Sequence, residues 1–183
     1  MGGVHSIWDY YLYSYVEQFQ AQFKKVAFRL VTDHTGNITQ SILDGTTDLG
    51  VVYSPPQHPD IEIITWKEET FKLIASKELN LSKHQVNLKG LNKYSFIYQE
   101  WGGEFHDWFH KEAGKNFLPS LEVGHAHLLL ELVSNNKAMC FILDSIQYKA
   151  VSPPPIQKLY IIYSKKNSKK LLIQGLVNKL MHN

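Results

Sequence analysis

The spacing of apolar residues changes several times along the chain, and each change predicts a new element. Near the start, apolar side chains recur at helical spacing over residues 6–23, which predicts a helix. Ser6 and Asp9 have the serine-x-x-acid form of a helix start, so we expect Ser6 to be the N-cap. A Gly-rich turn that opens straight into a helix normally follows a strand. Here only Met1 and Gly2 remain to supply one.

Strands and helices alternate through the rest of the chain. The predicted strands cover residues 26–34, 48–54, 61–65, 71–76, 95–99, 120–124, 138–143 and 158–164. The predicted helices cover residues 37–45, 88–91, 104–113, 125–136 and 168–180, with Gly45 as a C-cap and a stop at Gly114. Alternation of this kind predicts an α/β fold with parallel sheets.

The order of these elements predicts two lobes. Two βαβ groups stand on either side of a polar connector, and the last strand and helix need a partner. The economical arrangement returns them to the first group. We therefore predict one lobe from residues 1–75 with 156–183 and a second from residues 76–155, joined by two crossing segments, with a cleft between the lobes. Ligands in open α/β sheets bind beyond the carboxyl ends of the strands, so we expect contacts from the strand-to-helix turns.

Composition narrows the classes of function. The 183 residues are 44% hydrophobic, enough for a real core, but no run approaches the roughly 18 apolar residues that suggest a membrane helix. No basic segment followed by an apolar one opens the chain, so we expect no secretory signal and a cytoplasmic location. Cys140 is the only cysteine, which excludes an internal disulfide. With a net charge of +2 and Arg29 as the only arginine, a DNA-reading surface is not expected.

No group of residues predicts catalysis. Cys140 lies in an apolar run typical of a core strand, and no glycine-rich phosphate loop is present, so we expect neither an enzyme nor a cofactor. His106 and His110 are four residues apart, so one helix face would present both to a metal ion. His125 and His127 are also close in sequence. No complete ligand set accompanies either pair, and a surface helix with scattered histidines is the simpler interpretation.

Several segments, taken in order, resemble the effector-binding domain of LysR-type transcriptional regulators. They include "SILDGTTDLGVVYSPP", "FKLIASKELNLSKHQVNLKGLNKYSFIYQE", "FHDWFHKEAG" and "LEVGHAHLLLELVSNNKAMCFIL". The best single match is Gly45 together with the "DLGVV" of residues 48–52. The resemblance covers nearly the whole chain, and the order and spacing of the motifs are more specific than any one of them. Tyr13 departs from the family pattern where a proline is usual, and residues 135–138 lack the family's glycine turn.

The resemblance implies a type 2 periplasmic-binding-protein-like fold, with Rossmann-like lobes joined by two crossover segments and a small-molecule effector held between them. The effector contacts carried over position by position are His5, Ser6, Tyr53, Ser54, Gln99, Glu100, Trp101, Gly124 and His125. Helix N-termini at Ser6, Gly103 and His125 would direct free N–H groups at an anion. Glu100 would oppose a purely anionic effector, which favours an amino acid or similar zwitterion and leaves a plain organic acid open.

Each implied contact has an ordinary alternative. Ser6 can serve only as an N-cap, and Tyr53 can simply pack between the lobes. Trp101 is expected either as a lid over the ligand or as an exposed loop aromatic, and His5 and His125 are more often turn residues. In this fold the first strand is central. Either the first four residues supply it as a stub or another segment fills the gap, because unpaired buried backbone groups are costly.

The resemblance also implies the partners. We expect a small-molecule effector, a homodimer, no membrane partner, and DNA binding only through an N-terminal domain that this chain lacks. Effector binding would change the angle between the lobes and so reposition the DNA-binding domains. The alternatives to a regulator are a solute-binding receptor of a transport system and a metal-sensing domain that uses His106 and His110.

Overall fold

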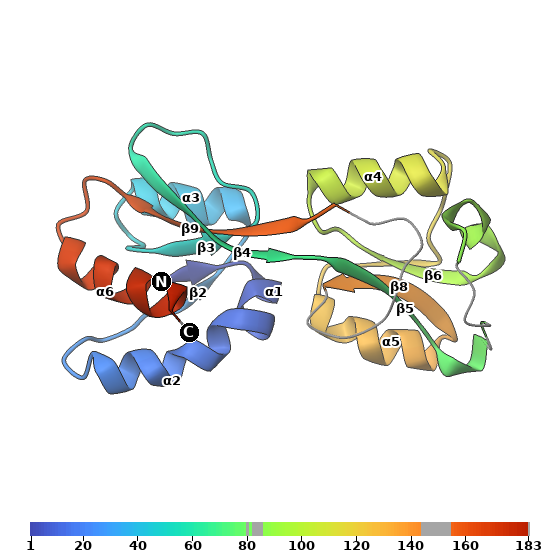
Figure 1. Ribbon diagram of the computed structural model, residues 1–183, viewed down its shortest axis with the longest axis horizontal. Helices are drawn as coiled ribbons and strands as arrows, with labels where there is room; N and C mark the ends of the chain where they lie inside the picture. Colours follow the sequence, from blue (N-terminus) through green and yellow to red (C-terminus); the bar gives the residue numbers. More distant parts are fainter. Residues whose placement is uncertain (80, 82–85, 144–154, 183) are drawn as a thin grey trace. The chain divides into compact units, whose positions relative to one another are not determined.

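The chain is divided into two compact units. The computed structural model describes residues 1–79, 81, 86–143 and 155–182 (Figure 1). Unit 1 comprises Met1–Glu68 with Lys158–Asn183, and unit 2 comprises Glu69–Gln157. The chain therefore passes from unit 1 into unit 2 and back once. The first boundary differs from the predicted one because the strand after residue 70 pairs within the sheet of unit 2.

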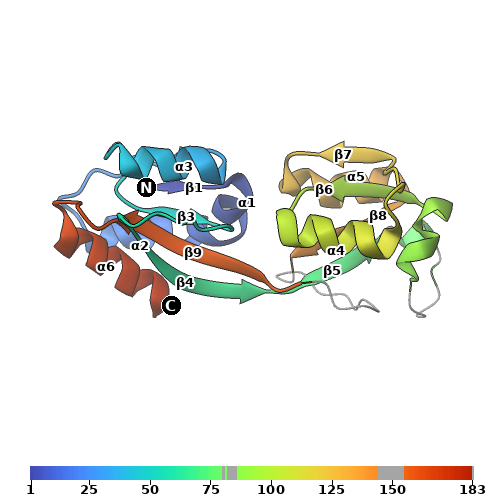
Figure 2. The ribbon, with the colours of Figure 1, turned by 90° about the horizontal axis from the view of Figure 1, so that it is seen from above.

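Unit 1 is built on a five-stranded sheet with the order β2-β1-β3-β9-β4 (Figures 1 and 2). Its strands are β1 (Gly2–Gly3), β2 (Val31–Thr32), β3 (Gly50–Val52), β4 (Ile61–Glu69) and β9 (Gln157–Ser164). β1 is parallel to both β2 and β3, with Gly2 opposite Val31 on one side and Gly50 on the other. β9 is antiparallel to β3, so the sheet is mixed, and the predicted parallel pairing holds for β2, β1 and β3.

The first strand exists as a two-residue stub at the centre of this parallel group. It pairs with a neighbour on each side, which confirms that the first four residues supply the strand and satisfies its backbone groups. Both residues are glycines because helices pack directly on them. A Cβ on Gly2 would lie 2.8 Å from Ile38 Cδ1, and one on Gly3 would lie 2.9 Å from Trp8 Nε1.

The short first strand also limits the strands beside it. Only Val31–Thr32 of the predicted strand 26–34 is paired, because β1 offers two residues for the ladder. β3 likewise keeps three of the residues 48–54. β4 is instead longer than predicted and extends to Glu69. The paired length of β2 therefore matches that of β1 and not the length of the apolar run.

The predicted helix over residues 6–23 forms, but in three consecutive segments. These are α1 (His5–Ile7), the π-helix η1 (Trp8–Leu12) and α2 (Tyr13–Gln22). Ser6 is not the N-cap. Val4 holds that position with extended backbone, and its carbonyl accepts from the N–H groups of Ile7 and Trp8. Ser6 therefore lies in the first turn, where its hydroxyl points to a partner outside the helix.

α3 (Thr35–Leu43) has Asp44 as its C-cap, and the predicted C-cap Gly45 is the next residue. α6 (Lys170–Met181) is the last helix of unit 1. Gly45 has a left-handed φ of 73° and donates to the Ile42 carbonyl, while Thr46 donates to the Ser41 carbonyl. This pair of bonds is the Schellman pattern that favours glycine. The apolar core that α3 forms with the sheet consists of Ile38, Ile42, Val52, Ile61 and Ile162.

Unit 2 repeats the parallel arrangement in a four-stranded sheet with the order β5-β8-β6-β7 (Figure 2). Its strands are β5 (Phe71–Ala75), β6 (Ser95–Gln99), β7 (Leu121–Val123) and β8 (Ala138–Leu143). β6 is parallel to β7 and β8, and β5 is antiparallel to β8. Its helical segments are η2 (Lys77–Leu79), η3 (Leu88–Lys93), α4 (Gly103–Ala113), η4 (Ala126–Leu128) and α5 (Leu129–Asn135).

Aromatic rings dominate the core of unit 2. The ring centroids of Phe71 and Phe105 are 4.5 Å apart, and those of Phe96 and Phe109 are 5.2 Å apart. Every residue of β8 is buried, including Cys140. Burial raises the pKa of the Cys140 thiol to about 12, so the thiol stays protonated at neutral pH. This agrees with the prediction of a core cysteine.

Candidate functional site

In unit 1 the carboxyl ends of β1 and β3 form a topological switch point. From β1 the chain passes through α1, η1 and α2 to β2 on one side, and from β2 through α3 to β3 on the other. In doubly wound sheets of this order, ligands bind beyond the strands where the direction reverses. The residues that follow β1 and β3 therefore form the first candidate site.

Two of the predicted contact residues meet at this switch point. Ser6 Oγ lies 2.8 Å from Tyr53 Oη, although the residues are 47 positions apart in sequence. Ser6 is only 7% exposed, and Tyr53 is half-buried. The pairing follows from the sheet, since Gly3 lies opposite Val51 and the chain continues from each in parallel. Either hydroxyl can donate or accept, so the pair can turn toward a polar ligand.

The other candidates of unit 1 lie at the same strand ends. His5 is the first residue of α1, and Ser54 follows Tyr53 directly. Both residues are exposed. The structure therefore places all four predicted residues of unit 1 at the switch point and brings two of them into contact.

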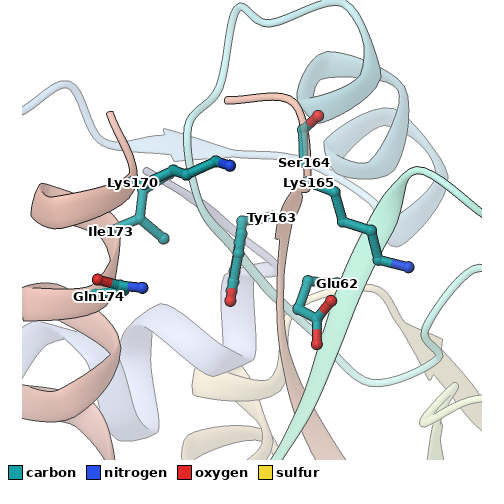
Figure 3. Close-up of a pocket in the computed structure, with 7 residues that line it drawn as sticks. All are labelled: Glu62, Tyr163, Ser164, Lys165, Lys170, Ile173 and Gln174. Atoms are coloured by element: carbon teal, nitrogen blue, oxygen red, sulfur yellow. The ribbon is translucent and has the colours of Figure 1, made fainter. Parts of the chain in front are cut away.

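A separate hollow of about 280 Å³ lies on the β9–β4 side of the same unit (Figure 3). Its lining residues are Glu62, Tyr163, Ser164, Lys165, Lys170, Ile173 and Gln174. Lys165 extends away from Lys170 in Figure 3, and its Nζ donates to the Pro59 carbonyl at 2.9 Å. The hollow is lined by two lysines and one carboxylate, and none of its lining residues was predicted as an effector contact.

Unit 2 has an equivalent switch point at β6 and β8. The chain runs from β6 through α4 to β7 on one side and then through α5 to β8 on the other. Gln99 ends β6, and its Nε2 donates to the Glu100 carbonyl at 3.1 Å. Its buried Oε1 has no hydrogen-bond partner among the described residues. A buried acceptor left in this state costs about 1–3 kcal/mol, so Gln99 offers an external donor a buried acceptor in the described part of unit 2.

Glu100, by contrast, is fully engaged by its own neighbours. Its Oε1 accepts from the Gly102 N–H at 2.8 Å, at the N-cap of α4. Its Oε2 accepts from Tyr98 Oη at 3.0 Å and lies 3.1 Å from His106 Nδ1. Burial, together with the charge of Glu100, raises the pKa of Tyr98, so the phenol remains a donor. The carboxylate is thus compensated within the chain, which weakens the argument that it would repel an anionic effector.

The remaining candidates of unit 2 differ more from expectation. Trp101 is 3% exposed, and its Nε1 donates to the Phe141 carbonyl at 3.2 Å. It belongs to the core, unlike the lid or exposed loop aromatic that we expected. Gly124 and His125 are exposed after β7. His125 is the N-cap of the 3-10 helix η4, which continues directly into α5 at Leu129, so the predicted helix begins here with a 3-10 first turn.

The sequence missed the cluster of Tyr98, Glu100 and His106. Tyr98 was assigned only to an apolar strand, and the Gly-Gly turn hid the proximity of Glu100 to the helix that follows.

The His106 and His110 rings lie 4.4 Å apart between centroids, as their spacing predicts. Within the described residues, no group of three or more His, Cys, Asp and Glu is arranged to hold a metal ion. No helix in this part of the chain is long and apolar enough to cross a membrane.

Comparison with known families shows to which protein family the chain belongs. The sequence model described as the LysR substrate binding domain matches residues 1–180. The chain belongs to the LysR substrate-binding domain family. The resemblance seen in the sequence is therefore confirmed. LysR proteins are transcriptional regulators, which also confirms the expectation that the chain is not an enzyme.

Known LysR-type proteins share the fold at low sequence identity. The HTH-type transcriptional regulator HdfR of Yersinia pestis (strain Pestoides F) is 21% identical over 193 residues, covering 100% of this chain. The chain spans 66% of the length of that relative. A structure of an OxyR mutant from Porphyromonas gingivalis matches with a TM-score of 0.80 at 16% identity, covering 100% of this chain and 94% of that one.

Two further structures support the same fold. CbnR, a LysR family transcriptional regulator, matches with a TM-score of 0.72 and 19% identity, covering 98% of this chain and 67% of that one. The CcmR regulatory domain of Synechocystis PCC6803, in complex with 2-PG, matches with a TM-score of 0.74 and 17% identity, covering 98% and 93%. The predicted type 2 periplasmic-binding-protein-like fold is confirmed by these matches.

Proposed function

We propose that this chain senses a small organic acid or amino acid as the effector-binding domain of a LysR-type transcriptional regulator. Family membership over residues 1–180 supports a regulator over a transport receptor. The CcmR regulatory domain, which shares the fold, is described in complex with 2-PG. The relatives of this chain are HTH-type transcriptional regulators, and the match covers 66% of their length. We therefore propose that DNA is contacted by a segment that corresponds to the remaining part of these relatives.

The hydroxyl pair of Ser6 and Tyr53 is the observation that carries the proposed effector site. It lies at the switch point of unit 1, and Ser6 belongs to the first turn of a helical run. The first N–H groups of a helix and its positive dipole end favour an anion, and the two hydroxyls add donors to it. A carboxylate of the effector is the group that fits these donors.

In unit 2, taken by itself, Gln99 is the proposed polar contact. Its buried Oε1 accepts no hydrogen bond from any described residue, so a hydrogen-bond donor on the effector would satisfy it. An ammonium or hydroxyl group supplies such a donor, whereas a plain carboxylate does not. This requirement favours an amino acid or a hydroxy acid, and it replaces the argument based on Glu100.

The test is a thermal-shift screen of amino acids, hydroxy acids and simple carboxylates, followed by calorimetry on each hit. A ligand at 100 times its Kd stabilises the protein by about 2.7 kcal/mol. Ser6→Ala and Tyr53→Phe should each weaken binding by roughly two- to twelvefold, the equivalent of about 0.5–1.5 kcal/mol for one hydrogen bond. Tyr13→Phe is the matched control, because Tyr13 is 78% exposed.

The result that would overturn the proposed site is a ligand whose Kd is the same for wild type, Ser6→Ala and Tyr53→Phe. Gln99→Ala is expected to weaken the binding of amino or hydroxy acids more than that of simple carboxylates, and an equal effect on both would exclude its proposed role.

We also propose a cytoplasmic homodimer, since the relatives are transcriptional regulators. Sedimentation at increasing concentration should show the dimer, and a monomer throughout would contradict it.

A further inference from the structure

We propose that His106 and His110 of α4 form a binding site for a divalent transition-metal ion, with Glu100 as the residue that positions His106. The two imidazoles lie one helical turn apart, with ring centroids separated by 4.4 Å. α4 is a regular helix of 11 residues, and Phe105 and Phe109 on its other face are buried in the core. The helix is therefore anchored, with His106 exposed and His110 half-buried beside it.

The hydrogen bonds around Glu100 fix the tautomer of His106. The ionised carboxylate can only accept, and its Oε2 already accepts from Tyr98 Oη at 3.0 Å. His106 Nδ1 lies 3.1 Å from the same oxygen and 3.3 Å from Tyr98 Oη, which can accept as well as donate. Because the carboxylate only accepts, Nδ1 carries the proton and donates it. The lone pair of the neutral ring is then on Nε2. Metal-binding histidines commonly donate their other ring N–H to a carboxylate in this way, which fixes the ring and raises its basicity.

The surroundings of the two rings limit the kind of metal. A surface groove borders both imidazoles together with Asp107, Lys111 and Lys115. No third protein ligand completes the set among the described residues, so water would fill the remaining positions. Two imidazole nitrogens suit Zn²⁺, Ni²⁺ or Cu²⁺ and not the oxygen-seeking Ca²⁺ or Mg²⁺. The expected order of affinity is Cu²⁺ above Ni²⁺ and Zn²⁺.

Calorimetric titration with ZnCl₂ and CuCl₂ in a non-chelating buffer tests the site on the whole chain. Wild type should bind one ion, and His106→Gln and His110→Gln should each abolish that binding while circular dichroism stays unchanged. His34→Gln is the matched control, because His34 is an exposed histidine at the N-cap of α3 and belongs to unit 1, whereas the pair belongs to unit 2. Binding that survives in both site variants, or no binding by wild type, would overturn the proposal.

The role of Glu100 has its own readout. Glu100→Gln should weaken metal binding by roughly 10- to 100-fold, as loss of such a partner usually does. Nitrogen-15 NMR of the imidazoles should show His106 protonated at Nδ1 in the metal-free wild type and a shift toward Nε2 protonation in Glu100→Gln. A wild-type His106 protonated mainly at Nε2 would exclude the positioning role, even if the two histidines bound metal.

Discussion

Replacing Gly50 by alanine tests how closely α3 packs on the sheet of unit 1. A Cβ at this position would lie 2.7 Å from Ile38 Cγ2, 2.9 Å from Ile42 Cδ1 and 3.3 Å from Ile162 Cγ1. All three distances are shorter than the 3.4 Å at which ordinary contact begins. The Ile38 atom is attached to a branched Cβ and cannot swing aside freely. Overpacking of this kind costs about 1–3 kcal/mol, so we expect Gly50→Ala to lower the free energy of unfolding by that amount.

Gly36→Ala is the matched control, because the same chemical change should have the opposite sign. Gly36 lies in α3, is exposed, and an added Cβ would meet nothing within 4 Å. Alanine is favoured over glycine inside a helix and also reduces the freedom of the unfolded chain. We expect Gly36→Ala to raise the free energy of unfolding by about 0.4–1 kcal/mol.

Urea unfolding followed by circular dichroism measures both changes. Tryptophan fluorescence supplies a second probe, since Trp8 and Trp66 lie in unit 1 while Trp101 and Trp108 lie in unit 2. The urea midpoint of Gly50→Ala should fall and that of Gly36→Ala should rise relative to wild type, with little change in the dependence of the unfolding free energy on urea concentration. A Gly50→Ala protein as stable as the wild type would show that α3 has room to move, and the packing argument would be wrong.

Three further predictions concern single contacts. Burial opposes ionisation of Asp48, but hydrogen bonds led by that from Lys169 outweigh it and lower its pKa. The ionised Asp48 carboxylate therefore stabilises the fold at pH values above its unfolded pKa. This contribution is lost as the pH falls through the native pKa. Asp48→Asn should therefore make the free energy of unfolding depend less on pH on the acid side. Cys140, with a pKa of about 12, should resist iodoacetamide at pH 8 in the native protein and react only in urea; rapid native labelling would contradict its burial. A double-mutant cycle of Ser6→Ala and Tyr53→Phe should give a coupling of about 0.5–1.5 kcal/mol in unfolding experiments, and purely additive effects would argue against their hydrogen bond.

The sequence by itself determined which kind of element most segments form. Apolar spacing is a local property, and it identified β6 at residues 95–99 and β8 at residues 138–143 with the bounds that the structure has. Glycine also acts locally, because a left-handed φ admits few other residues, so Gly45 and Gly114 marked two helix ends correctly. Several motifs in a fixed order further pointed to the LysR family, which the match over residues 1–180 confirms.

Only the tertiary structure decided the partners of these elements and of the side chains at their ends. β2 is short because β1 is short, which no pattern within residues 26–34 records. The hydroxyl of Ser6 meets Tyr53 because two parallel strands lie side by side, although a local motif favoured capping. Trp101 is buried because the core of unit 2 surrounds it, while its loop sequence suggested either a lid over the ligand or an exposed aromatic. Burial and long-range hydrogen bonds depend on which segments pack together, and that information is spread over the whole chain and not held in any single window.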